Sequence, residues 1–293
     1  MTEDFKQYCL KKGYSIKTIK SKNSQLKYFG LWLIERQLNI ETLTTQNLLE
    51  CLSWLKEKNI QGAALRNSLQ AIRLYLDCQV EEGIIEYNPA LILRVRYGGH
   101  KVKVQPLPLK TIEAIYQWFT SLEYQNEKKN VIHKRDIVLL GLLLFQGLDS
   151  GDLERLRVQD INLQQGTVYV PSSRTNAARK LKLESVQILP IQEYFLTTRE
   201  KVPRCQQQSD KLVPQSKIND ILSRIVEQLK KQYPEIEGSR HIRSSVIMNW
   251  LKSNHIRQVQ YMAGHRLVSS TEKYQKEDLY DLAQQLNRYH PMK

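Results

Sequence analysis

The segment 239-SRHIRSSVIMNWLKSNHIRQVQYMAGHRLVSSTEKYQ-275 holds both the helical pattern and the reactive side chains that decide the fold of the second half of the chain. Apolar residues recur every four positions from Ile242 to Trp250, which predicts a helix with one buried stripe. A three-residue repeat from Ile256 to Met262 predicts a second, shorter helix. The segment therefore reads as helix, short helix, turn and helix.

Two end signals place the reactive residues relative to these helices. Gly264 stands where a left-handed C-cap would end the short helix, and His265 follows it directly. Ser269 and Glu272 have the spacing of a capping box, which predicts that a third helix starts there. Tyr274 then falls in the first turns of that helix.

Arg240, Arg243, His265 and Tyr274 are residue types that fit phosphate chemistry. Arginine binds a phosphate through a fixed fork of donors, and histidine exchanges a proton near neutral pH. A tyrosine hydroxyl can attack phosphorus and hold it as an ester. Each residue alone is more often structural, but their combination in this order favours a functional site.

The segment resembles the C-terminal motif of the tyrosine recombinase, or phage-type integrase, family. That family has His-x-x-Arg on one helix, Leu-Gly-His before a turn, and a nucleophilic tyrosine nine residues after this histidine. Here Arg240 to Arg243 fills the first motif, Ala263-Gly264-His265 the second, and Tyr274 the third. The resemblance implies that Tyr274 is the nucleophile, and that Arg243, His265 and Arg240 bind phosphate.

The first arginine of the family motif is absent. It normally follows Gly-Leu, but Gly147-Leu148 is followed by Asp149, which places an anion where a cation is expected. Three nearby arginines are alternatives for the missing charge: Arg155, Arg157 and Arg135.

A predicted β-hairpin supplies the remaining family position. TVYVP at 167–171 and the residues 181–183 read as paired strands, and SSRTNAARK between them is polar and basic. The family has a lysine at this tip. Arg174 aligns best with it, and Lys180 is the alternative. Because arginine donates a proton poorly, the general-acid role is left open.

The resemblance implies cofactor-free DNA cleavage and rejoining through a 3′-phosphotyrosyl intermediate, with no metal. It implies double-stranded DNA as the partner and a homo-oligomer, a tetramer on DNA, joined by exchange of the C-terminal helix. A mobile element as the source of such an integrase is part of the same expectation.

Composition agrees with a polyanionic partner. The chain carries a net charge of +14, and residues 1–100 contribute only 14 basic against 10 acidic residues. No lipidation signal, long apolar span or signal peptide is evident, so a membrane partner is not expected. Scattered cysteines without a CxxC pair fit reduced thiols in a cytoplasmic protein.

We expect a mainly α fold with a small β-sheet (α+β), divided into two domains. Residues 1–92 read as four helices that form the family's core-binding, DNA-binding bundle. Residues 93–108 hold two glycines, two prolines and no acidic residue, which predicts a basic linker that can lie along DNA. Residues 109–293 form the catalytic domain, in which 276–288 is the exchange helix.

Three functions compete. The favoured one is an active site-specific recombinase. The second is a DNA-binding accessory or regulatory protein on the same fold with weakened or lost cleavage, which Asp149 supports. The third is a nicking-closing topoisomerase, which the N-terminal helical bundle and the size of the chain disfavour.

Overall fold

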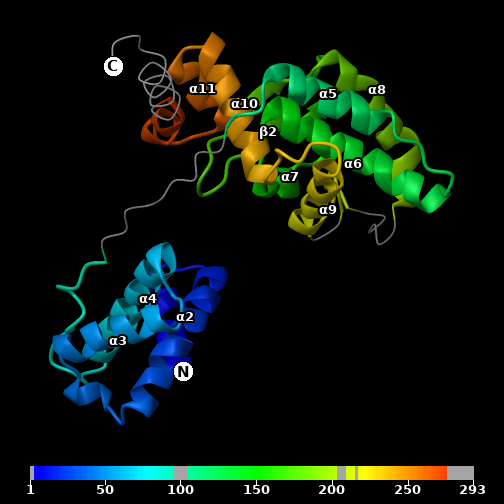
Figure 1. The fold of residues 1–293 in the computed structure, drawn as a ribbon. Helices are drawn as coiled ribbons and strands as arrows, with labels where there is room; N and C mark the ends of the chain where they lie inside the picture. The colour runs from blue at the N-terminus through cyan, green and yellow to red at the C-terminus, as the bar shows by residue number, and fades with distance from the viewer. Residues whose placement is uncertain (1–2, 96–104, 203–208, 215–216, 276–293) are drawn as a thin grey trace, which may run out of the picture. The chain divides into compact units, whose positions relative to one another are not determined.

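A computed structural model describes residues 3–95, 105–202, 209–214 and 217–275 (Figure 1). Two compact units divide the chain, Met1–Val102 and Lys103–Lys293. Within the described residues, none of the helices combines the length and the apolar character needed to cross a bilayer. The predicted linker at 93–108 lies largely outside the described residues, so its limits and its place on DNA stay predictions.

The first unit is built from helices around one apolar core. Its core centres on Trp32, Leu48, Leu55, Ile72 and Leu76, each at most 1% exposed. Thr44 caps the third helix in a capping box with Asn47, as its position before the apolar pattern predicts. The helices are α1 (Glu3–Lys11), α2 (Ile16–Glu35), the 3-10 turn η1 (Ile40–Thr42), α3 (Thr45–Glu57) and α4 (Gly62–Glu81).

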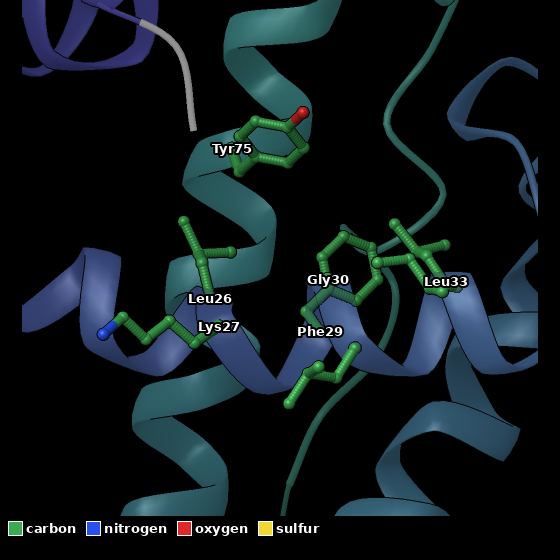
Figure 2. A pocket seen from close by; sticks show the side chains of 8 residues that line it. Leu26, Lys27, Phe29, Gly30, Leu33 and Tyr75 are labelled. Carbon is green, nitrogen blue, oxygen red and sulfur yellow. The ribbon is translucent and has the colours of Figure 1, made fainter.

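An apolar hollow of about 420 Å³ lies between α2 and α4. Figure 2 shows Leu26, Phe29, Leu33 and Tyr75 around it, with Lys27 as the charged side chain of the lining. Such a lining lacks the nucleophile and the group of cations that the sequence predicts.

The second unit is a helical domain with a small sheet at one side. Its central helix, α6, is buried almost all round from Ile137 to Leu144, as the longest apolar run predicts. The three-stranded antiparallel sheet has the order β1-β2-β3. The helices and strands are α5 (Leu109–Thr120), α6 (Glu127–Gln146), α7 (Ser150–Arg155), η2 (Val158–Asp160), β1 (Ile161–Asn162), β2 (Thr167–Val170), β3 (Arg179–Lys182), α8 (Ser185–Glu193), η3 (Tyr194–Thr198), η4 (Arg199–Lys201), α9 (Ile218–Lys230), α10 (Ser239–Ser253) and α11 (Ile256–Ala263).

The predicted limits of two helices, α6 and α7, were wrong. α6 starts eight residues before the predicted Arg135, because the Asn126 side chain caps it through the Lys129 amide. α7 ends at Arg155 and not near Val158, since Leu156 turns extended and accepts a bond from the Leu212 amide. The predicted hairpin is confirmed, with Tyr169 opposite Lys180, but the short strand β1 was missed.

The segment 239–275 has the predicted order of helices. Ile242 and Val246 are buried in the core, and Gly264 ends α11 in the left-handed conformation, with φ of +73°. Residues 269–275 are helical, and their first amides bond to the Leu267 and Val268 carbonyls. The predicted exchange helix at 276–288 lies outside the described residues.

Candidate active site

A pocket of about 890 Å³ opens between the hairpin tip, α10 and the turn after α11. Its lining contains three cationic side chains, Arg174, Arg266 and Lys273, and no carboxylate. A hollow of this charge suits an anion such as a phosphodiester. The lining residues are Arg174, Thr175, Asn176, Ser244, His265, Arg266, Leu267, Ser270, Lys273 and Tyr274.

Tyr274 is held against the body of its own domain. Its ring stacks on the His265 imidazole, with centroids 6.0 Å apart and planes 4° from parallel. The same ring packs on a small apolar cluster of Ile247, Val259 and Ala263, supplied by α10 and α11. The phenol is therefore half-buried and fixed at the pocket wall.

His265 is a neutral imidazole in this environment. Burial, helped by the Arg243, Arg179 and Lys273 cations and opposed by the Asp149 carboxylate, lowers the pKa of His265 to about 4. Its Nδ1 lies 2.9 Å from Oγ1 of the fully buried Thr271. This contact orients the ring and leaves Nε2 for a group in the pocket.

Arg243 lies behind the pocket and is only 12% exposed. Its guanidinium donates to the carbonyl oxygens of Gly147 and Ala263, the latter at 2.9 Å. It also stands 3.6 Å from the Asp152 carboxylate and 3.9 Å from that of Asp149. Arg243 thus joins α10 to the turn before α7 and to the end of α11.

A buried carboxylate that the sequence analysis did not single out, Asp152, organises the cations. Arg179 binds it at 2.6 Å and Arg155 at 2.8 Å, and both the Asp152 and Arg179 side chains have no exposed surface. Asn176 donates to it at 3.1 Å. Buried arginines that lie close together require such a counter-ion. The spacing of the basic residues along the chain does not show which carboxylate supplies it.

Asp149, which stands where the family motif has arginine, points into this network. Its Oδ1 accepts the Asp152 amide and so caps α7, and its Oδ2 accepts from the Asn176 side chain. Burial alone would raise the pKa of Asp149. The Arg243 cation, the Asp152 amide and the Asn176 side chain outweigh burial and hold the pKa below its usual range.

A model of the phage integrase family matches residues 107–279, and a model of the phage integrase N-terminal SAM-like domain matches residues 3–83. The chain belongs to the phage integrase family.

Relatives of this integrase-family chain include named recombinases. It is 24% identical to tyrosine recombinase XerD of Vibrio cholerae over 96% of this chain and 92% of that protein. It is also 24% identical to tyrosine recombinase XerC of Proteus mirabilis, over 94% and 88%.

Solved structures share the fold of this integrase-family chain. The Tn1549 transposon integrase in complex with a circular intermediate DNA superposes with a TM-score of 0.69, at 13% identity and 93% coverage of both chains. A lambda integrase dimer bound to a COC′ core site gives 0.64, at 17% identity, over 92% of this chain and 75% of that one.

The structure separates the two hairpin candidates of this integrase-family chain. Arg174 is exposed at the tip and lines the pocket. Lys180 lies on β3 outside the lining, and its ammonium donates to the Gln165 side chain at 2.9 Å. Of the two, Arg174 is the one that lies at the pocket.

Arg240 and its neighbour His241 both lie outside the pocket lining. Arg240 is exposed in the first turn of α10 and does not line the pocket. Its neighbour His241 is structural, because its ring bonds the Gln105 carbonyl at 2.9 Å and accepts from the Glu237 amide.

Of the three alternatives for the missing first arginine, Arg155 contacts the network around Asp152. Arg135 pairs with Asp136, and Arg157 with Asp210 at 3.1 Å. The described residues contain no group of carboxylates, histidines and cysteines suited to hold a metal ion.

Proposed function

We propose that this chain is a tyrosine-type site-specific DNA recombinase in which Tyr274 is the nucleophile. The observation that carries the proposal is a phenol stacked on a neutral histidine inside a pocket lined by three cations and no carboxylate. Double-stranded DNA is the proposed substrate, in line with the net charge of +14.

In the proposed step, the Tyr274 oxygen attacks a backbone phosphorus and the bond from phosphorus to the 5′ oxygen breaks. The phenol loses its proton, and the departing 5′ oxygen gains one. The product is a 3′-phosphotyrosyl ester beside a free 5′-hydroxyl, and the reverse attack by another 5′-hydroxyl rejoins strands. The ester conserves the energy of the broken bond, so no cofactor is needed.

Four side chains in or near the pocket are assigned to charge stabilisation in this step. Arg174 donates to the non-bridging oxygens, where negative charge develops. With the Thr271 hydroxyl on Nδ1, His265 offers its Nε2 hydrogen to the same oxygens. Arg243 contributes positive charge from behind, and Arg240 would have to act from outside the described pocket lining.

Lys273 is our candidate for the group that protonates the leaving oxygen. Arginine cannot serve, because its guanidinium does not lose a proton in proteins. Lys273 lines the pocket one residue before the nucleophile, and an ammonium can give up a proton. This assignment fills the role that the arginine at the hairpin tip leaves open.

We further propose that the chain acts as a tetramer on DNA joined through its C-terminal helix, in the cytoplasm, on behalf of a mobile element. The solved relative bound to a core site is a dimer, and another is bound to a transposon circular intermediate. The dimeric relative supports an oligomer on DNA, and the transposon relative supports a mobile element as the source.

A second function has one observation in its favour. Asp149 is ionised beside Arg243, whose guanidinium already bonds two carbonyls. Such a centre has less free positive charge for a phosphate than one with a further arginine. A DNA-binding accessory protein with weak or lost cleavage is therefore the alternative.

One experiment separates the two functions without knowledge of the target site. The full chain is mixed with a library of nicked duplexes that have random sequence around the nick. Cleavage near the nick releases the short fragment that carries the 5′-hydroxyl, so rejoining is blocked. Denaturing washes then keep only covalently joined DNA, which is sequenced. Recovery with the natural chain and none with Tyr274→Phe supports the recombinase. Salt-sensitive binding without any adduct supports the accessory protein.

A further inference from the structure

The hairpin tip is fastened to the start of α7 by one amide group. The Asn176 Nδ2 donates to Oδ2 of Asp149 at 3.1 Å and to Oδ1 of Asp152 at 3.1 Å, so both of its hydrogens have carboxylate acceptors. Asn176 is only 8% exposed. A buried amide that lost one of these acceptors would keep an unsatisfied donor, which is strongly unfavourable.

Position 149 suits this contact only when its side chain accepts hydrogen bonds. The two carboxylate oxygens of Asp149 have separate partners, since Oδ1 caps α7 at the Asp152 amide and Oδ2 receives Asn176. An arginine here would present donors alone and would face the Asn176 amide with another donor. The residues at 149 and 176 are therefore matched to each other.

The fastened tip carries Arg174. Ser173 and Asn176 close a tight turn around it, because the Ser173 amide bonds the Asn176 carbonyl at 2.8 Å. The Arg266 side chain holds the Ser173 carbonyl at 2.6 Å, and the Ala177 amide bonds the Gly264 carbonyl at 2.8 Å. Asn176 ties the inner side of this turn to α7.

We propose that Asp149 is a positioning residue that fastens the hairpin tip through Asn176 and so keeps Arg174 at the wall of the phosphate pocket. The replacement of the first arginine by Asp149 then removes one direct phosphate contact and holds a second one, that of Arg174, in a better-ordered position. This inference rests on the proposed function for the role of Arg174, but the contact itself can be tested without DNA.

The first test is amide hydrogen exchange in Asp149→Asn. Asparagine is a strong N-cap, so α7 stays capped, but its amide cannot satisfy both the cap and Asn176. We expect exchange at the amides of Asn176 and Ala177 to quicken by roughly tenfold or more. Asp160→Asn is the matched control, because Asp160 accepts the Arg157 amide at the start of η2. It should leave both amides unchanged.

A double-mutant cycle isolates the pair. Asp149→Asn and Asn176→Ala should each quicken amide exchange at Ala177. Exchange there in the double variant should be no faster than in whichever single variant exchanges faster. Thermal unfolding of all three variants checks that they fold. Unchanged exchange in Asp149→Asn, or additive effects in the double variant, would overturn the proposal.

Two adduct measurements connect the contact to Arg174. In the natural chain, Arg174→Ala should slow adduct formation by roughly tenfold or more, but it should matter little in the Asp149→Asn background, where the tip is already loose. Asp149→Arg should also slow it. If that variant is faster and keeps slow exchange at Asn176, position 149 is only a weakened phosphate contact and the proposal fails. If the natural chain forms no adduct, the proposed function fails, and the exchange experiment still decides the contact.

Discussion

Among single side chains, Lys273 is distinguished in the pocket by an ammonium that can release a proton. We predict that Lys273→Arg, which keeps the charge, lowers the rate of adduct formation by about a hundredfold or more, because general-acid catalysis is lost. A substrate with sulfur in place of the bridging 5′ oxygen should restore the rate, since a thiolate leaves without being protonated.

The rescue is the informative result of that experiment. If Lys273 only binds phosphate, the sulfur substrate will be cut as slowly by the variant as the oxygen substrate. Arg174→Ala serves as the comparison, because its loss removes charge stabilisation and the sulfur substrate should not restore it.

The environment of His265 also makes folding depend on pH. Its pKa is about 4 in the folded chain, against about 6.5 when unfolded, so folding favours the neutral ring. This contribution is present above pH 6.5 and is lost as the pH falls toward 4. We predict that urea-unfolding free energies of the natural chain and His265→Gln converge over this range. A difference independent of pH would contradict the shift. His133, which also has a lowered pKa, is common to both proteins and cancels.

At the scale of elements, the end of α11 meets β3 at a point with no room for a side chain. Gly264 has φ of +73°, and a Cβ there would lie 2.8 Å from Cζ of the buried Arg179. Gly166 has a similar φ of +58° with open space around it. Gly166→Ala should cost about 1–2 kcal/mol from backbone strain, and Gly264→Ala about 1–3 kcal/mol more from the clash. Urea unfolding of the two variants measures the difference, and equal losses would show that the contact with Arg179 is loose.

The elements that sequence alone predicts are those with a strong local signal. The apolar repeats of α10 and α11, Gly264 as a cap and the hairpin at 167–183 needed no tertiary information. The start of α6 was missed although its cap, Asn126, is local, whereas the end of α7 was missed because a distant residue decides it. Leu156 leaves the helical conformation to pair with Leu212.

For the site, motif spacing indicated Tyr274, His265 and Arg174, and the structure brings these three to one pocket. Motif spacing could not indicate Asp152, Asn176 or Thr271. Their roles depend on which buried donors and acceptors meet across separations of 6 to 27 residues. The same holds for Asp149, since sequence alone showed only that it carries the wrong charge.

For the whole molecule, binding to DNA should depend on salt in proportion to the phosphates contacted. We predict that Arg174→Ala lowers the slope of log affinity against log salt concentration by about 0.9, the value for one phosphate contact. Lys128→Ala removes another exposed cation, at the far end of α6 and about 27 Å from Gln146 at the helical rise, and should leave the slope unchanged. Fluorescence anisotropy with a labelled duplex gives both slopes, and equal changes would remove Arg174 from the contact surface.

The packing of the Tyr274 ring on Ile247, Val259 and Ala263 has a consequence for assembly. We predict that, in the proposed assembly, every subunit offers Tyr274 in cis, to the cations of its own catalytic domain. A mixture of Tyr274→Phe and Arg243→Ala subunits therefore contains no complete centre, and mixed assemblies should stay as inactive as either parent. Complementation between the two variants would require that Tyr274 leave its packing on α10 and α11 and reach the cations of another subunit.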